Sequence, residues 1–362
     1  MAPESGKAYR IAEFKRNQLI TRQADMTTGT KKQMLVDRRR FLQIIAVAGA
    51  AGAGWTLGLY RNSSRYKVVR ASRAMMGTVV NLTLYGPEKS RLEDAVETTL
   101  ARMLALEKLL SRHDPASELA RLNLTGNIKR PSHDLITVLE LARFISDKTN
   151  GAFDITVLPL VKLQQAGRIP DRVSIEKALA VTDYRHITID EDKIVLTRQG
   201  MGLTLDGIGK GYIVDQGVEA LKQNGFGNAY VEAGGDLMVS GRKPGDKPWR
   251  IGIKNPRPSR SGKLVILKTS NRAVATSGDY MQAYSKDFAR HHIVNPKTGY
   301  SPPELASATI TAPTVALADA LATAAMVMGH KKSIAMLQTM PNCEGYFIDK
   351  KLNHYQSTGF SG

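Results

Sequence analysis

Asp-Gly-Ile-Gly-Lys-Gly-Tyr, residues 206–212, joins an apolar segment that predicts a strand to a periodic segment that predicts a helix. Its Gly-x-Gly-x-Gly spacing differs from the Gly-x-Gly-x-x-Gly of a dinucleotide-binding βαβ unit. It also lacks the Gly-Lys-Ser/Thr ending of a Walker loop. Glycines let a ligand approach the backbone, the N–H groups at a helix start favour an anion, and Lys210 adds a positive charge. The segment therefore predicts either a pyrophosphate-binding turn or a plain tight turn, outside both common nucleotide-binding folds.

The segments on either side of this turn predict a mixed fold. Helical periodicity covers residues 88–110, 133–149, 209–224 and 315–328, and a short helix is expected at 117–123. Strands are expected at 68–69, 76–86, 186–190, 193–197, 204–205, 229–232, 236–240, 249–253, 264–269 and 273–277. Because helices and strands do not alternate strictly, the pattern favours the α+β class over a doubly wound Rossmann sheet. We predict a single mixed α/β domain over residues 66–362, with antiparallel strands and packed helices.

The composition fits a folded chain with an unusual charge. Of the 362 residues, 42% are hydrophobic, which is enough for a core, and the formal net charge is +18. Such an excess first indicates nucleic acid or a membrane surface as a partner. No zinc, helix-turn-helix or basic-aromatic motif accompanies it, so we expect no nucleic-acid partner. Cys343 is the single cysteine, which excludes an internal disulfide and a cysteine-based metal site.

More than half of the charge excess lies near the N-terminus. Residues 1–70 contain 14 Lys or Arg and four Asp or Glu, a net charge of +10. Asp-Arg-Arg-Arg-Phe-Leu-Gln at 37–43 leads into an uncharged, Gly- and Ala-rich run at 41–60, the pattern of a twin-arginine export signal. We predict a signal at 37–62 and export to the periplasm by the twin-arginine translocase. The run is weakly apolar for a membrane helix. No clear cleavage site stands out, so an uncleaved signal that anchors the chain to the inner membrane stays open.

Residues 1–36 are long for the region that precedes the arginines of such a signal. A start at Met34 would give a compact one. The segment is polar and has no periodicity, so we predict a disordered extension or a wrongly assigned start. The twin-arginine route carries proteins that are already folded, which suggests cofactor or metal loading before export.

Three further polar segments are candidates for the site. Glu-Ala-Gly-Gly-Asp at 232–236 fits a turn between two strands. Thr-Ser-Gly-Asp-Tyr at 276–280 either holds a ligand through hydroxyl and backbone groups or forms an Asp-containing turn. His291 and His292 precede an Asn-Pro-Lys-Thr-Gly turn at 295–299. An imidazole there that points into a site suits a general base near neutral pH, and packing beside a strand end is the plainer alternative.

Asp319 and Thr323 are four residues apart on the helix expected at 315–328, so both project from one face. The rest of that helix is Ala, Leu, Val and Met, and a carboxylate there is costly to bury unless it is paired or binds a metal. A carboxylate and a hydroxyl are hard oxygen ligands that suit Mg²⁺. The alternative is an aspartate at the solvent edge of the helix.

Taken in order, these segments resemble the ApbE family of FAD:protein FMN transferases. The resemblance covers residues 68–329 and implies an ApbE-like, T-fold-like domain. Eight segments carry it: 76–78, 110–119 with Asn123, 151–157 with Pro159 and Leu160, the Gly-Lys-Gly-Tyr segment through Asp215, 232–236, 276–280, 292–299 and 318–324.

The resemblance implies an enzyme that binds FAD with Mg²⁺, cleaves the pyrophosphate of FAD, and attaches FMN through a phosphoester to a Thr or Ser of a partner flavoprotein, with release of AMP. It places Mg²⁺ on Asp319, Thr323 and the backbone carbonyl of Gly207. It makes His292 the base that activates the acceptor hydroxyl, with Asp319 as the second catalytic residue. The implied FAD-binding residues are Met76, His113, Ala152, Phe153, Asp154, Thr204, Asp206, Lys210, Asp236, Thr276, Ser277, Gly278, Asp279 and Ile293.

Three positions depart from the family pattern. Thr-Leu-Asp-Gly at 204–207 replaces the usual Asp-Leu-Gly-Gly, so either Thr204 or Asp206 takes the place of the usual flavin-contacting aspartate. Asn295 replaces the aspartate of the His-Ile-Ile-Asp-Pro pattern, and His113 stands where other members often have an aromatic residue.

The resemblance also bears on partners. The chain lacks a Ser/Thr-Gly-Ala-Ser/Thr acceptor motif, so it is expected to modify another protein that carries one. Its export signal is similar to that of the NosX-type members linked to nitrous oxide respiration, whose implied acceptor is a membrane-bound electron-transfer subunit. Two alternatives stay open: an FAD pyrophosphatase, in which water replaces the protein hydroxyl, and a non-catalytic periplasmic flavin-binding protein.

Overall fold

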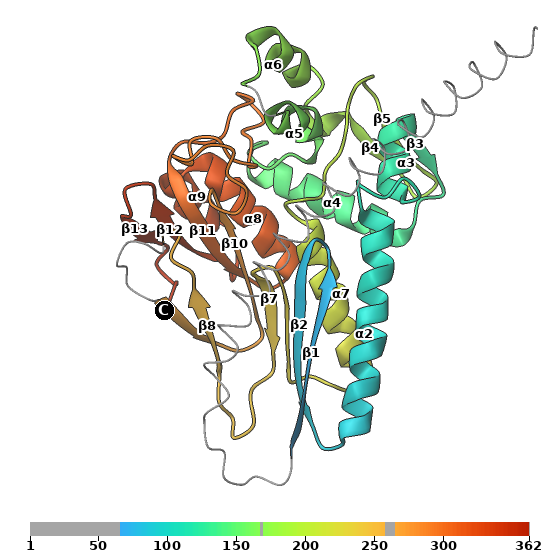
Figure 1. Ribbon diagram of the computed structural model, residues 1–362, viewed down its shortest axis with the longest axis vertical. Helices are drawn as coiled ribbons and strands as arrows, with labels where there is room; N and C mark the ends of the chain where they lie inside the picture. Colours follow the sequence, from blue (N-terminus) through green and yellow to red (C-terminus); the bar gives the residue numbers. More distant parts are fainter. Residues whose placement is uncertain (1–65, 167–168, 258–264, 362) are drawn as a thin grey trace, which may run out of the picture. The chain divides into compact units, whose positions relative to one another are not determined.

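In a computed structural model of the chain, residues 66–166, 169–257 and 265–361 are described (Figure 1). The leader predicted at 1–36 and the signal predicted at 37–62 lie outside these ranges. Within the ranges, no helix has both the length and the apolar character that crossing a membrane requires.

An antiparallel sheet forms the centre of the described part. Its eight strands lie in the order β1-β2-β6-β7-β10-β11-β12-β13, and each neighbouring pair is antiparallel. The bounds are β1 Lys67–Met75, β2 Thr78–Gly86, β6 Ala229–Ala233, β7 Asp236–Ser240, β10 Arg272–Gly278, β11 Leu305–Ala312, β12 Glu344–Asp349 and β13 His354–Gln356. Two small sheets accompany it: β3 Asn127–Lys129, β5 Lys193–Leu196 and β4 Ile187–Ile189 form one, and β8 Trp249–Ile253 with β9 Val265–Thr269 forms the other.

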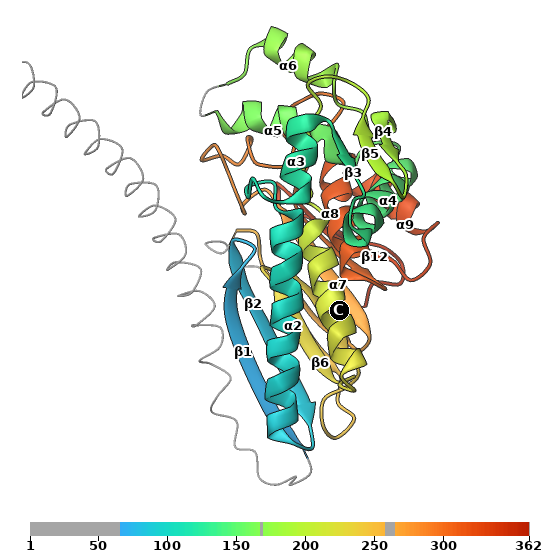
Figure 2. The ribbon, with the colours of Figure 1, turned by 90° about the vertical axis from the view of Figure 1, so that its right-hand side faces the viewer.

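Helices α2, α7 and α8 pack against one face of the large sheet, as Figures 1 and 2 show. The bounds are α2 Lys89–Leu110, α3 Glu118–Thr125, α4 His133–Lys148, α5 Leu158–Gln165, α6 Arg172–Leu179, α7 Gly209–Gln223, α8 Val315–Met328 and α9 His330–Leu337, with 3-10 turns η1 Ile155–Val157 and η2 Tyr184–His186. Helix α2 contacts β1, β2 and α7; α7 contacts β6, β7 and α8; and α8 contacts β10 and β11. Side-chain caps set several helix starts: Ser132 accepts a hydrogen bond from the N–H of Leu135, and Thr314 accepts one from that of Leu317.

The main core lies between these helices and the sheet. Leu82 of β2, Leu106 of α2 and Val214 of α7 are almost completely buried in it. Helix α8 is buried along most of its length, and Asp319 is its single charged residue. A sequence with apolar residues on all sides of a helix gives such a central helix.

The sequence-based prediction of an α+β class with antiparallel strands is confirmed, and the four long predicted helices agree with α2, α4, α7 and α8 within two residues at each end. Two strand predictions are wrong in detail. The predicted strand at 76–86 begins with a tight turn, because Met76 and Gly77 have φ values of 52° and 67° and connect β1 to β2. Residues 204–205 form no strand: the N–H of Thr204 donates to the carbonyl of Ile155 (2.8 Å), and the chain runs without a ladder partner into α7.

Helices α7 and α8 cross at Gly211. A Cβ atom at this position would lie 2.6 Å from the carbonyl oxygen of Val315 and 2.7 Å from the Cα of Ala316, so only glycine permits this approach. One helical turn later, the carboxylate of Asp215 accepts hydrogen bonds from the N–H groups of Val315 (2.8 Å) and Ala316 (2.9 Å). The first turn of α8 is thus fixed to the first two turns of α7.

We expect Gly211→Ala to destabilise the fold, because the new methyl group meets backbone atoms that cannot move aside. The free energy of unfolding should fall by about 1–3 kcal/mol, the usual effect of overpacking. Gly227→Ala is the matched control, since a Cβ at exposed Gly227 has no heavy atom within 4 Å. Urea denaturation of both variants checks this; equal stability of Gly211→Ala and the wild type would show that the crossing is not tight.

Candidate functional site

A lysine and two aspartates from three elements form the centre of the site. Lys210, in the first turn of α7, places its Nζ 2.6 Å from Oδ2 of Asp236 and 3.6 Å from Oδ2 of Asp319. Asp236 begins β7 and Asp319 lies in α8, and both carboxyl groups are buried. The N–H of Gly211 also donates to Oδ2 of Asp319 (3.3 Å). The glycine turn at 206–212 is therefore joined to both aspartates.

The charges of this cluster are unequal. Burial and the nearby Asp236 raise the pKa of Asp319 from 3.8 to about 7. Burial alone would lower the pKa of Lys210, but Asp236 and Asp319 outweigh burial and raise it above its ordinary value. Lys210 is thus an ammonium ion between two carboxyl groups, and it can compensate only one of them.

A hydroxyl group extends the cluster along α8. Thr323 follows Asp319 by one turn, and its Oγ1 lies 3.2 Å from Oγ of Ser277, near the end of β10. A Cβ on Gly207 would lie 2.9 Å from Oγ1 of Thr323 and 3.3 Å from Cε2 of Phe153. The structure thus brings together four predicted site residues that are far apart in the sequence.

The residues at this point fit Mg²⁺. Asp319, Thr323 and the carbonyl of Gly207 are hard oxygen donors. Oδ1 of Asp319 makes no hydrogen bond to a described residue, because both polar contacts of this carboxylate are to Oδ2. Across the described ranges, no group of three or more His, Cys, Asp or Glu side chains could hold a metal ion. A metal here would therefore depend on mixed donors, and its other ligands would be water and substrate oxygens.

The departure at residues 204–207 has a structural consequence. Oγ1 of Thr204 accepts a hydrogen bond from the N–H of Asp206 (3.2 Å), and Thr204 is buried. The carboxylate of Asp206 instead faces Arg112, whose Nε and Nη2 lie 3.1 and 3.0 Å from Oδ2. Arg112, within the predicted motif at 110–119 but given no role by sequence reasoning, therefore fixes the turn that ends at Gly207.

Ala152, Phe153 and Asp154 form a buried segment before η1. Oδ1 of Asp154 accepts hydrogen bonds from the N–H (2.8 Å) and the hydroxyl (2.6 Å) of Thr156, and Oδ2 accepts one from the N–H of Tyr184 (3.1 Å). Burial raises the pKa of Asp154. This carboxyl group thus holds in place the segment that carries Phe153.

The two predicted histidines face different surroundings. His291 is fully buried, and its Nε2 lies 3.2 Å from the carbonyl oxygen of Pro302. The N–H of His292 donates to the carbonyl of Gln282 (3.0 Å). The Nδ1 atoms of both rings are buried and make no hydrogen bond within the described part of the chain. Burial, together with nearby His291 and Lys210, lowers the pKa of His292 to about 4, so its imidazole is neutral at pH 7.

The other predicted FAD-binding residues lie outside the Lys210 cluster. The N–H of Met76, in the β1–β2 turn, donates to Oε1 of Glu107 (2.7 Å), and His113 is exposed on the loop between α2 and α3. Thr276 and Gly278 lie in β10, where Oγ1 of Thr276 is 2.8 Å from Oγ1 of Thr309. Ile293 is buried, and Asp279 forms an ion pair with Arg257. No hydrogen bond or ion pair between described residues joins Met76, His113 or Asp279 to the cluster.

Comparison with known proteins places these residues in a family. The sequence matches the ApbE family over residues 76–347. The chain belongs to the ApbE family. An FAD:protein FMN transferase of Treponema pallidum is 31% identical and covers 80% of this chain and 87% of its own length. An FAD:protein FMN transferase of Vibrio cholerae is also 31% identical, and the match covers 81% of this chain and 91% of that protein.

Solved ApbE structures have the same fold. The Thermotoga maritima ApbE protein is 30% identical, with a TM-score of 0.72 over 81% of this chain and 97% of that one. The flavin transferase ApbE from Vibrio cholerae is 28% identical, with a TM-score of 0.72, and the match covers 82% of this chain and 98% of that one. The ApbE-like fold predicted from the sequence is therefore confirmed, and the family predicted from the ordered segments is the family that matches.

The neutrality of His292 can be measured directly. We expect the ring signals of His292, in histidine-labelled protein, to titrate with a midpoint near pH 4 and to be assigned by their loss in His292→Gln. Since an unfolded histidine titrates at about 6.5, the unfolded chain takes up a proton that the native state does not, and stability falls as pH drops from about 6.5 to about 4. A midpoint near 6.5 would contradict this description of the site.

Proposed function

We propose that this chain is a Mg²⁺-dependent flavin transferase, which moves FMN from FAD to a Thr or Ser hydroxyl of a partner flavoprotein and releases AMP. The observation that carries the proposal is the convergence of Lys210, Asp319, Thr323 and Gly207 at the start of α7. The family membership and the names of the relatives support it.

The start of α7 is suited to hold the pyrophosphate of FAD. The N-cap residue Ile208 makes no side-chain hydrogen bond, and the N–H of Gly211 donates to Asp319. The positive end of the helix dipole therefore lies beside Lys210, where it would favour an anion such as the pyrophosphate. Lys210 brings an ammonium group, and its contacts with Asp236 and Asp319 hold the side chain in one orientation. Mg²⁺ on Asp319, Thr323 and Gly207 would neutralise the charge that develops when the pyrophosphate is cleaved.

His292 is suited to take the proton of the acceptor. Its pKa is lowered to about 4, so the imidazole is unprotonated near neutral pH, and its Nδ1 makes no hydrogen bond to a described residue. A general base needs such an unprotonated nitrogen, although the low pKa makes this imidazole a weak base. In the proposed step, the acceptor oxygen forms a bond to the FMN phosphorus and the bond from that phosphorus to the bridging oxygen breaks. AMP leaves with the bonding electrons, and the hydroxyl proton passes to His292.

The partner and the location belong to the same proposal. A flavoprotein with a Ser/Thr-Gly-Ala-Ser/Thr motif would be the acceptor, since such a motif places a hydroxyl beside small residues that leave room for FMN. The twin-arginine pattern at 37–43 supports export to the periplasm, where the acceptor would be a membrane-bound electron-transfer subunit. Whether the signal is cleaved or anchors the chain does not alter the chemistry at Lys210.

A transfer assay tests the proposed function. The purified protein is incubated with FAD, Mg²⁺ and a peptide that carries the acceptor motif, and intact mass and AMP are measured. We expect an FMN adduct on the peptide and one AMP for each adduct, both lost with EDTA and in Asp319→Ala. AMP release without an adduct on several acceptor peptides would indicate an FAD pyrophosphatase, and FAD binding without AMP would indicate a flavin-binding protein.

A second assay tests the role of His292. We expect His292→Gln to lower kcat for transfer by about 10²- to 10⁴-fold, the usual contribution of a general base. FAD affinity, measured by flavin fluorescence, should change little because this imidazole acts on the acceptor. His133→Gln, at an exposed histidine of α4, is the control. Full activity of His292→Gln would assign the proton transfer to another group.

A further inference from the structure

The connection between β10 and β11 folds back on itself before it reaches His292. Ala283 and His291 form an antiparallel bridge. The N–H of Tyr284 donates to the carbonyl of Arg290 (2.7 Å), and that of His292 donates to the carbonyl of Gln282 (3.0 Å). We call residues 282–292 the His292 hairpin. Its first and last residues are paired, so the position of His292 depends on the position of the whole hairpin.

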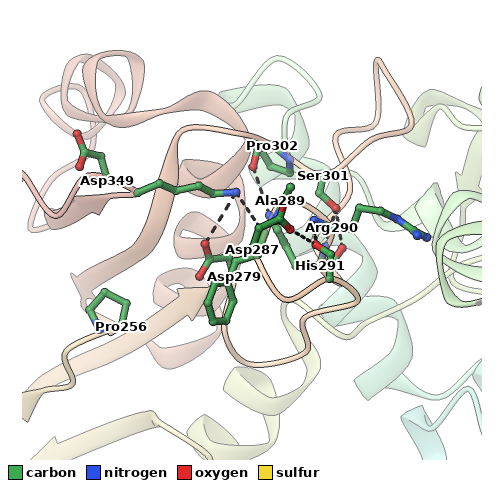
Figure 3. A network of polar contacts seen from close by, with 12 residues as sticks. Pro256, Asp279, Asp287, Ala289, Arg290, His291, Ser301, Pro302 and Asp349 are labelled. Carbon is green, nitrogen blue, oxygen red and sulfur yellow. Dashed lines mark hydrogen bonds and ion pairs between the residues drawn. The ribbon is translucent and has the colours of Figure 1, made fainter. Parts of the chain in front are cut away.

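The tip of the hairpin has little apolar cover of its own. Lys286, Asp287 and Ala289 are exposed, and Phe288 has a φ of 60°. Such a segment opens easily unless contacts from outside hold it. Ser301 supplies one set of contacts at the base of the hairpin. Its Oγ accepts a hydrogen bond from the N–H of His291 (2.9 Å) and donates one to the carbonyl of His291 (2.8 Å). Figure 3 shows these contacts together with that of His291 to Pro302.

A second set of contacts holds the tip from two distant segments. Arg257, which follows β8, donates through Nη1 and Nη2 to the two carboxylate oxygens of Asp279, each at 2.8 Å, and its guanidinium lies 3.9 Å from the ring centre of Phe288. Lys350, after β12, donates to the carbonyl of Phe288 (2.8 Å) and lies 3.9 Å from Asp279. We call these four residues the Arg257 clamp.

The clamp is centred on a buried carboxylate. Asp279 has no exposed surface, and its carboxylate faces two cations. Removing one partner of a buried, hydrogen-bonded ion pair is costly, because it leaves an uncompensated charge. The planar guanidinium also stacks on Phe288 while it bonds Asp279, which an ammonium group cannot do. Arg257 thereby fixes both the entrance of the hairpin, at Asp279, and its tip.

We propose that Arg257 is a positioning residue, which holds the His292 hairpin so that the imidazole of His292 meets the acceptor hydroxyl. The inference rests on the proposed role of His292 in flavin transfer. It goes beyond that role because Arg257 lies on a different element and acts through Asp279 and Phe288.

Three variants test the proposal. We expect Arg257→Gln to lower kcat for transfer by about 10- to 100-fold, as a misplaced catalytic group does, while KM for FAD and the fluorescence-derived Kd of FAD stay within about twofold. Arg257→Lys keeps the positive charge and loses the paired contact of two nitrogens with Asp279, so its kcat should lie between those of Arg257→Gln and the wild type. Phe288→Leu, which removes only the stacking, should lower kcat less than Arg257→Gln. Arg250→Gln, at an exposed arginine of β8, is the control.

A second measurement follows the hairpin itself. In folded Arg257→Gln, the ring titration of His292 should move from about pH 4 toward the ordinary value near 6.5, because a loosened hairpin exposes the imidazole. Unchanged kcat together with an unchanged titration would overturn the proposal, as would an equal loss of kcat and FAD affinity. If the wild-type protein transfers no flavin, the proposed function fails, and the titration alone then decides whether Arg257 holds His292.

Discussion

The close crossing of α7 and α8 at Gly211 is the constraint on which the site depends. Because residue 211 has no side chain, the first turn of α7 lies against the backbone of Val315 and Ala316. Asp215 then binds the free N–H groups at the start of α8. This contact sets the register between the two helices, and the register brings Lys210 of one helix to Asp319 of the other. Any residue larger than glycine would separate the groups that the proposed chemistry requires.

The electrostatics of the cluster explain why a divalent cation and an anion fit the same place. Two buried carboxyl groups face one ammonium group, and burial together with the nearby Asp236 raises the pKa of Asp319. Mg²⁺ would add a second positive charge and draw the phosphates of FAD toward Lys210. The net charge of +18 in the sequence is not needed for this, since the positive side chain of the cluster is Lys210 alone.

The sequence predicts the long, periodic elements well. The apolar periodicity of α2, α4, α7 and α8 was sufficient, and so was the pairing of Asp319 with Thr323 at helical spacing. The sequence did not predict β11 and β12, because strands that are buried on both faces, such as β11 with its Ala, Ser and Thr residues, lack alternation. It did not predict β13 because this strand has only three residues. Helices α5, α6 and α9 have only eight residues each, too few for a clear period.

The sequence does not predict contacts between distant segments. Neither the pairing of Arg112 with Asp206 nor that of Arg257 with Asp279 has a local signal, since 94 and 22 residues separate the partners. The sequence also does not predict that the neighbours His291 and His292 face different surroundings. This difference follows from the antiparallel pairing of the hairpin, which places the ring of His291 against Pro302. The sequence predicts which groups react, and the fold shows what holds these groups in place.

The most direct test is a crystal structure of the protein with FAD and Mn²⁺ in place of Mg²⁺, with the metal located by anomalous scattering. We expect an anomalous peak within bonding distance of Asp319, Thr323 and the Gly207 carbonyl, and the pyrophosphate of FAD beside Lys210. A metal bound elsewhere, or FAD whose phosphates lie away from the start of α7, would contradict it.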